Sequence, residues 1–312
     1  MMSDMASMPM SMPMPLPFTW GRIATFDVSW MTTVLLLLVL LLYLFGVRRY
    51  RTCTPGSSWS RKRTLSFVAG IICVFLATQS VIGVYDMTLF TDHMIQHLLL
   101  VMIAAALFAM AAPLELACTT LPGAAGRGFN RAVDSKVGEF LGYPAVGFIL
   151  YAIFIPLTHL TSLFNLMLSQ MWVHHLEQFA FVMIGYLFWR PVVAIEPSRH
   201  PLSPGLRMIY LALAVPVDTF TGLALVMSDH ELFSTYSSMH RTWGPSLLTD
   251  LKTGGAVMWI GGDFLMLLAI FPIAFFWMRD EDSKIDDLDA RLDAERLAAG
   301  LPFTRHEMHP HD

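Results

Sequence analysis

The sequence contains seven long apolar segments joined by polar links, and this pattern is the strongest constraint on the fold of the chain. A helix needs about 20 mostly apolar residues to cross the hydrocarbon core of a bilayer, and its backbone must satisfy its own hydrogen bonds there. Hydrophobic residues make up 55% of the 312 and charged residues only 14%, as in membrane proteins. The sequence therefore predicts an all-α integral membrane protein, a seven-transmembrane-helix bundle. Its predicted spans lie near residues 29–47, 64–84, 93–117, 143–159, 171–193, 207–228 and 251–278.

These spans divide the chain into three parts. A Met/Pro-rich tail, residues 1–28, precedes the membrane domain at residues 29–278, and an acidic tail with a short predicted helix follows at residues 279–312. The sequence has neither a phosphate-binding glycine loop nor a basic soluble domain, so nucleotide-driven transport is not supported and nucleic acid is not an expected partner. The lipid bilayer is the partner that this composition implies.

Basic residues in the links orient the predicted bundle. Loops that face the cytoplasm carry an excess of Lys and Arg. The links after predicted spans one, three and five carry twelve basic residues, against three on the opposite side: Arg22, Arg241 and Lys252. The twelve are Arg48, Arg49, Arg51, Arg61, Lys62, Arg63, Arg127, Arg131, Lys136, Arg190, Arg199 and Arg207. The sequence thus predicts a multi-pass plasma-membrane protein with its N-terminus outside and its C-terminus in the cytoplasm.

The N-terminal tail is methionine-rich and contains prolines that prevent a helix. Four methionines alternate with Pro or Ser: Met8, Met10, Met12 and Met14. Thioether sulfur is a soft ligand that suits Cu(I), so this tail is a candidate Cu(I) site. The alternative is a compositionally biased tail that binds nothing.

Seven of the eleven histidines fall on the predicted outer side. Two of them, His93 and His97, lie four positions apart at the start of span three, so on a helix their imidazoles project from one face. Such a pair suits one metal ion, or one imidazole can ligate a haem. The alternative is that both only mark the wet end of a membrane helix. Ionisable residues within spans are rare and usually functional, which favours a site.

A second pair, His174 and His175, opens span five at the same predicted level, and Glu177 follows on the face of His174. A carboxylate in this place can ligate a metal or orient an imidazole. Two helices packed about 8–10 Å apart could close four imidazoles around one small ion. Three further candidate ligands lie on the same side: His159, Met94 and Met258.

Two carboxylates, Asp218 and Asp263, fall near the middle of predicted spans six and seven. A carboxylate at that depth must be neutral, paired or hydrated. The sequence therefore predicts a role for both, either in a proton path or as a polar lock between the two spans.

Four stretches between residues 84 and 278 carry a family resemblance: TDHMIQHLLL with AAPLEL, HHLEQFAFVMIGYLFWRPVV, PVDTFTGLALVMSD with RTWG, and DLKTGGAVMWIGGD. Together they resemble the polytopic, CtaG-type cytochrome c oxidase assembly factors of bacteria. The family's H-x3-H element falls on His93 and His97, and its D-x3-GG element on Asp250, Gly254 and Gly255. The resemblance implies a bacterial inner-membrane protein that matures a haem–copper oxidase by handling copper. Its implied partners are the oxidase subunits or other copper chaperones.

The residues alone leave other functions open. A b-type cytochrome would use single histidines, such as His97 with His174, as axial ligands. A zinc-dependent membrane hydrolase would use three His or carboxylate ligands and a water, with Glu177 as the general acid or base. A purely structural partner protein would tolerate the loss of every outer histidine. Copper suits imidazole, and thioethers favour Cu(I), so the methionines and the resemblance together favour a copper-handling assembly factor over an enzyme.

Overall fold

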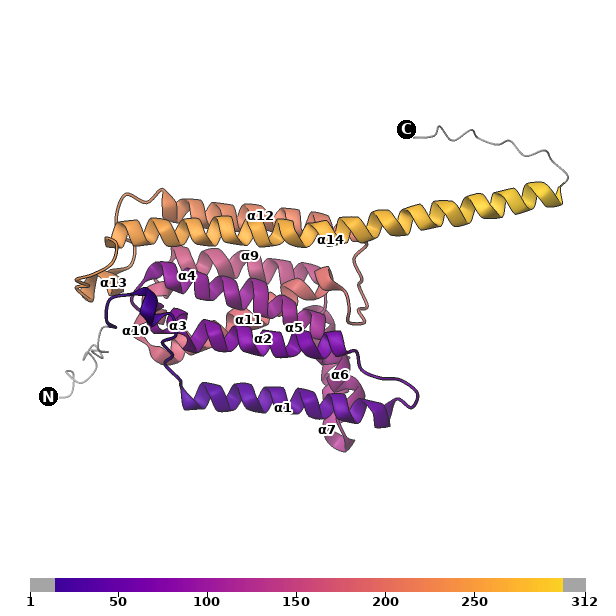
Figure 1. Cartoon of the computed structure of the whole chain (residues 1–312), viewed down its shortest axis with the longest axis horizontal. Helices are drawn as coiled ribbons and strands as arrows, with labels where there is room; N and C mark the ends of the chain where they lie inside the picture. The colour runs from indigo at the N-terminus through magenta and orange to yellow at the C-terminus, as the bar shows by residue number, and fades with distance from the viewer. Residues whose placement is uncertain (1–14, 300–312) are drawn as a thin grey trace.

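The computed structural model describes residues 15–299 as helices joined by loops, and this part of the chain contains no β-strand (Figure 1). The longer helices are α1 (Trp30–Cys53), α2 (Arg61–Gln79), α4 (Phe90–Leu98), α7 (Gly123–Val133), α9 (Pro144–Leu160), α11 (Met171–Val193), α12 (Pro204–Val226) and α14 (Leu247–Ala298). The shorter ones are η1 (Trp20–Arg22), α3 (Val81–Tyr85), η2 (Leu99–Ala104), α5 (Ala105–Ala111), α6 (Pro113–Thr120), α8 (Lys136–Leu141), α10 (Leu163–Ser169) and α13 (Ser234–Ser238).

Five segments among the described residues are long and apolar enough to cross a membrane: α1, α2 with α3, Phe90–Thr120, α12 and α14. A sixth crossing results if α9 and α10, which are bent by 72° relative to each other, form one span. Helix α11, predicted as span five, is not in this set because its histidines, Glu177 and Arg190 make it more polar. The all-helical fold with several candidate membrane spans is confirmed, whereas the number seven and the orientation of the termini stay predictions.

The third predicted span is a broken helix. Its backbone runs through α4, the π-helical segment η2 and α5, and then turns at Ala112, whose φ of 52° is left-handed. Pro113 is the first residue of α6, where its missing N–H costs no hydrogen bond. The residue before a proline also avoids the right-handed helical region, so the break falls where the sequence places the proline.

Helix α11 runs through the interior of the bundle and packs against η2, α5, α9, α10 and α12. Gly185 permits this close approach, because a Cβ there would lie 2.7 Å from Val101 O of η2. Trp189 Nε1 donates a hydrogen bond to the same carbonyl oxygen at 3.0 Å. Small residues at helix contacts are typical of membrane bundles. His174 and Glu177 of α11 are therefore buried among other helices, whereas His175 is exposed.

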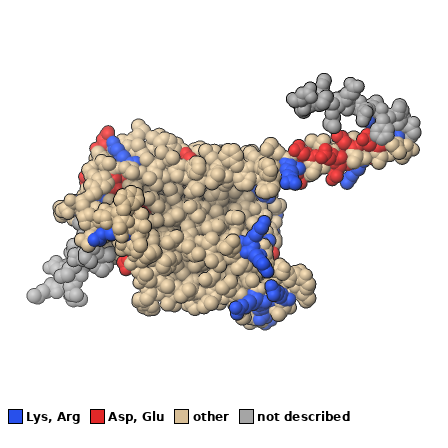
Figure 2. Space-filling view, viewed as in Figure 1, with Lys and Arg blue, Asp and Glu red and all other residues tan. Residues whose placement is uncertain are grey.

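Helix α14 has 52 residues, about 78 Å at 1.5 Å per residue. Its first half packs along α12, and its last part extends away from the bundle (Figure 1). Residues 279–299 are exposed, and acidic side chains gather on this extension (Figure 2). The short helix predicted in the acidic tail is thus the continuation of the last membrane helix.

The two ends of the bundle differ in their side chains. One end, which we call the histidine end, carries α3, α10 and α13 and the histidines of α4 and α11 (Figure 1). The other, the arginine end, carries α6, α7 and the link from α1 to α2, where Lys and Arg gather (Figure 2). By the positive-inside rule the arginine end would face the cytoplasm.

Candidate metal centre

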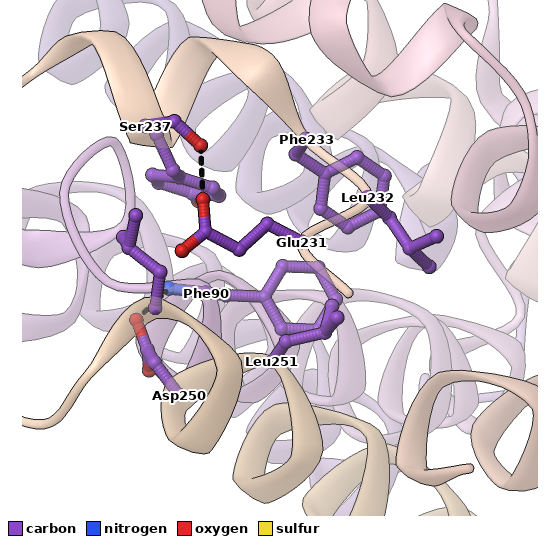
Figure 3. Close-up of a pocket in the computed structure, with 9 residues that line it drawn as sticks. Phe90, Glu231, Leu232, Phe233, Ser237, Asp250 and Leu251 are labelled. Atoms are coloured by element: carbon purple, nitrogen blue, oxygen red, sulfur yellow. Dashed lines mark hydrogen bonds between the residues drawn. The ribbon is translucent and has the colours of Figure 1, made fainter. Parts of the chain in front are cut away.

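The site is built on the first turns of α4, whose start is capped by a carboxylate of α14. Asp250 Oδ2 accepts a hydrogen bond from Phe90 N at 2.9 Å (Figure 3), and Asp250 Oδ1 accepts from Thr91 N at 3.1 Å and Thr91 Oγ1 at 2.7 Å. Arg241 Nη1 lies 3.1 Å from Asp250 Oδ2 and balances its charge. The first N–H groups of a helix have no intrahelical acceptor, so this cap fixes where α4 begins.

Three buried side chains converge one turn further along α4. His93 and His97 of α4 and Glu177 of α11 offer ligand atoms that lie within 4.8 Å of one another. His97 Nε2 is 3.2 Å from Glu177 Oε1, and His93 Nε2 is 3.7 Å from Glu177 Oε2. The three residues are 0%, 3% and 2% exposed, respectively. An i, i+4 histidine pair and a carboxylate from the facing helix thus form a three-ligand set.

The hydrogen-bond network assigns the tautomers of both histidines. His93 Nδ1 lies 3.3 Å from the carbonyl oxygen of Asp86, to which it can only donate. His159 Nδ1 lies 2.8 Å from Ile155 O and also donates, so His159 Nε2 must accept the 3.0 Å hydrogen bond from His97 Nδ1. Both α4 histidines therefore carry their proton on Nδ1 and keep a free lone pair on Nε2.

These Nε2 atoms are the ones that face Glu177. Within residues 15–299, neither His93 Nε2 nor His97 Nε2 has a hydrogen-bond partner, and neither does Glu177 Oε1. Buried polar groups are normally satisfied, so three unsatisfied acceptors in one place need an explanation. Metal-ligating histidines typically donate their other N–H to an oxygen or nitrogen acceptor, as both do here. The arrangement fits a cation bound by two imidazoles and one carboxylate.

His174 holds Glu177 in place from the side opposite His97. Its Nδ1 is 3.3 Å from Glu177 Oε2, and its Nε2 is 3.2 Å from Asp86 Oδ2. Gln96 Nε2 donates to the same oxygen of Asp86 at 2.6 Å. Asp86, at the end of α3, therefore contacts His174 through its carboxylate and His93 through its carbonyl oxygen. One residue orients both sides of the three-ligand set.

The other predicted ligands lie around this set or face away from it. His175 is exposed, and its Nδ1 lies 3.4 Å from Gln178 Oε1. His159 stands behind His97 as its hydrogen-bond acceptor. Met94 is fully buried on the side of α4 that faces Gly254 of α14. Met258 lines a small cavity together with His97 and His159.

The remaining predicted residues lie elsewhere. Asp218 is buried and accepts a hydrogen bond from Tyr151 OH at 2.6 Å. Asp263 is partly exposed and accepts one from Thr219 Oγ1 at 2.8 Å. The methionines Met8, Met10, Met12 and Met14 lie outside the described residues.

Sequence reasoning missed Asp86, and it gave Asp250 a place in a family element without a physical role. Asp86 stands in a link, where no helical period relates it to the histidines. The available signal was an acidic residue seven positions before His93, at the predicted outer surface. Asp250 is similarly distant in sequence from the helix that it caps.

A cover of aromatic side chains separates the three-ligand set from the solvent at the histidine end. The Phe164 ring lies 4.9 Å from the His93 ring and 4.2 Å from the Phe233 ring, measured between centroids. Tyr236 of α13 donates a hydrogen bond to the carbonyl oxygen of Asp86 at 2.9 Å. Burial raises the pKa of Tyr236 well above its ordinary value, so its hydroxyl remains a donor. The cover is thus attached to the same carbonyl oxygen that fixes His93.

A pocket lies between this cover and the start of α14 (Figure 3). Phe90 and Leu251 line its inner side, and Glu231 lies at its rim, where Ser237 Oγ donates to it at 2.6 Å. The pocket reaches the cover from outside but not the ligand atoms themselves, since neither α4 histidine lines it.

The chain is similar in sequence to known bacterial proteins over most of its length. A family model described as cytochrome c oxidase caa3 assembly factor matches residues 41–280. An uncharacterized protein of Mycobacterium bovis is 25% identical over 248 residues, and one of Mycobacterium leprae is 27% identical over 248 residues. Each alignment covers 77% of this chain but only 38% and 37% of the relatives, so the chain spans less than two fifths of their length. No solved structure matches the chain.

Proposed function

The chain belongs to the family of cytochrome c oxidase caa3 assembly factors, and from this premise we propose that it binds copper and helps deliver it to the oxidase. The proposed copper ligands are His93, His97 and Glu177. The proposed location is a bacterial inner membrane, with the histidine end outside. The proposed partners are subunits of the oxidase or other copper chaperones that exchange metal with them.

One observation carries the proposal: three unsatisfied ligand atoms of the described chain face one another in a buried place. Two neutral imidazoles and one carboxylate have a net charge of −1, which a cation would balance. Imidazole suits copper, zinc, iron and nickel, so the ligands alone do not choose the metal. Copper is favoured because the oxidase named by the family is a haem–copper enzyme, and because Met102 and Met258 line the small cavity next to His97.

The metal content of the purified protein tests this function. We expect copper in the wild-type protein and its loss in the variant His93→Ala with His97→Ala, because two of the three ligands are removed. His175→Ala is the matched control, since His175 is a neighbouring histidine that is exposed and faces away. In cells, the double variant should lose haem–copper oxidase activity while other respiratory enzymes persist. Full copper content together with full oxidase activity in the double variant would refute the proposal.

A zinc enzyme is the second candidate, because a His–His–Glu set with a free fourth position is also a catalytic zinc site. The same measurement separates the two: zinc in place of copper, with oxidase maturation unaffected, would favour a hydrolase. The ring of His97 stacks on Phe181 with centroids 3.8 Å apart, and its Nε2 faces Glu177 at 3.2 Å. This packing disfavours the haem alternative, because an axial ligand needs the macrocycle next to its free nitrogen.

Reporter fusions test the proposed orientation and the seven spans. A reporter that is active only outside the cell should work within Ser234–Ser238 and fail after Phe303. The basic links support this orientation. The opposite pattern of activity would place the copper site in the cytoplasm and exclude delivery from outside.

A further inference from the structure

A second group of side chains with donor atoms adjoins the three-ligand set and shares His97 with it. It lines a small cavity enclosed by α4, η2, α9, α11, α12 and α14. The side chains with donor atoms are Met102, Met258, Asp218, Tyr151, His97 and His159. The cavity begins at His97 and continues along the same run of helix to Met102, five residues further.

Asp218 leaves one carboxylate oxygen unsatisfied in this place. Its Oδ1 accepts the hydrogen bond from Tyr151 OH at 2.6 Å, but its Oδ2 is buried and has no hydrogen-bond partner within the described chain. The residue itself is only 2% exposed. A carboxylate inside a membrane bundle must be neutral, hydrated or paired with a cation. Arg and Lys are absent from the lining, so an amino-acid counter-charge is not supplied there.

The other donors of the cavity select the class of cation. Met102 and Met258 contribute thioethers, which are soft ligands that suit Cu(I) and not hard cations such as magnesium. Both residues are almost fully buried. A cation with one positive charge would balance the negative charge of the Asp218 carboxylate.

The backbone that presents Met102 has an unusual form. Met102 lies in η2, the π-helical segment between α4 and α5. Short π-helical segments inside α-helices occur frequently at functional sites, because they redirect side chains from the regular helical positions. The unsatisfied carboxylate, the two thioethers and the π-helical segment are independent features of the same cavity.

We propose that this cavity is a second, Cu(I)-selective site, with Met102, Met258 and Asp218 as its ligands. The proposal of this second site rests on the proposed function in one respect: both take copper as the metal that the chain handles. The set formed by His93, His97 and Glu177 suits either copper or zinc, whereas the two thioethers of the deeper site favour Cu(I). The two sites therefore differ in selectivity, and Met258 belongs to the deeper one.

Metal titrations of the full-length protein test this second site. Under anaerobic conditions we compare Cu(I) binding, measured by competition with a chromophoric Cu(I) chelator, with Zn(II) binding. The variant Met102→Leu with Met258→Leu conserves side-chain volume and should bind one Cu(I) fewer than the wild type, with unchanged Zn(II) binding. Asp218→Asn should weaken the same Cu(I) equivalent at least tenfold. Met266→Leu is the matched control, because Met266 is a fully buried methionine of α14 that does not line the cavity.

The outcomes separate this site from the first one. The variant His93→Ala with Glu177→Gln should lose zinc but keep the Cu(I) equivalent that depends on Met102 and Met258. If that equivalent persists while no copper binds at the histidines, the proposed function fails and the second site stands. If the double methionine variant binds as much Cu(I) as the wild type, or loses zinc as well, a separate Cu(I) site is refuted.

Discussion

Two buried glutamates near opposite ends of α11 have opposite surroundings. Glu196, just beyond the helix at the arginine end, accepts hydrogen bonds from Leu114 N at 2.9 Å and Tyr186 OH at 2.7 Å. Arg190 Nε lies 2.9 Å from it and balances its charge. Glu177, in the second turn at the histidine end, faces imidazoles instead, and its Oε1 has no hydrogen-bond partner within residues 15–299. Both are buried, but only Glu196 has both oxygens satisfied.

We interpret this difference as one between a structural carboxylate, Glu196, and a proposed metal ligand, Glu177. Glu196 connects α11 to the first turn of α6, and its interactions are complete without any further group. Glu177 lies among nitrogen atoms whose lone pairs are fixed toward it by the hydrogen bonds of Asp86 and His159. A buried acceptor without a hydrogen-bond partner lowers the stability of the fold, and a cation bound to Glu177, as proposed above, would remove that cost. Both carboxylates are buried, so burial does not distinguish the two roles. What distinguishes them is whether each carboxylate oxygen has a hydrogen-bond partner.

Replacing each glutamate with glutamine should give the largest difference in metal content between two variants. Glu177→Gln should abolish tight metal binding, because it removes the only anionic ligand, and should leave the protein folded. Glu196→Gln should retain metal in the folded protein but lower its unfolding free energy by about 3–5 kcal/mol, since Arg190 is left without its counter-charge. Metal content and thermal unfolding in the same detergent measure both effects. Equal losses of metal in the two variants would contradict the distinction.

Asp86→Asn should have the next largest effect. Asp86 does not belong to the three-ligand set, but its carboxylate contacts His174, which in turn contacts Glu177. Loss of such a supporting contact typically lowers metal affinity about 10–100-fold. Metal competition measures the affinity, and the spectrum of the bound Cu(II) should change as Glu177 reorients. Asp229→Asn, at an exposed position of the link after α12, is the control. An unchanged affinity would show that Glu177 is held without Asp86.

The parts that sequence predicted correctly have a local, periodic signal. Apolar runs located the helices, and the four-residue spacing placed His93 and His97 on one face toward Glu177. The same geometry explains why the expected four-imidazole cluster is not what the structure shows. Consecutive helical residues differ by about 100° in direction, so His174 and His175 cannot both face α4. His174 faces the interior, and His175 faces out.

The parts that sequence did not reveal depend on contacts between distant segments. Asp86 acts from a link, and Asp250 caps a helix that begins 160 positions earlier. Neither contact leaves a periodic pattern in the chain. The break at Ala112 had a signal in Pro113, but the apolar run continues through it, so hydropathy alone predicts a single helix. The polar contacts between distant segments of the bundle could therefore be identified only from the structure.

Substitution of Asp250 should have the smallest effect on metal affinity. It extends the comparison of the two glutamates to a third buried carboxylate, at the histidine end. Its oxygens are satisfied by Phe90 N, Thr91 and Arg241, so it resembles Glu196 even though it lies next to the metal site. Asn caps helices as well as Asp does, so Asp250→Asn should keep the start of α4 and bind metal almost as the wild type. Asp250→Ala removes the cap and also leaves the buried Arg241 without its counter-charge, so the unfolding free energy should fall by about 3–5 kcal/mol. The lost cap alone, about 1 kcal/mol, corresponds to at most about a fivefold loss of metal affinity if it acts entirely on the histidine positions. Ser246→Ala, which removes the cap of α14 itself, is the control, because the hydrogen bonds of Ser246 Oγ are local: they join it to Thr249 N at 3.2 Å and to Thr249 Oγ1 at 2.8 Å. If Asp250→Asn lost all metal, the Asp250 carboxylate would have to be a metal ligand. Complete hydrogen bonding of a buried carboxylate would then not identify a structural role.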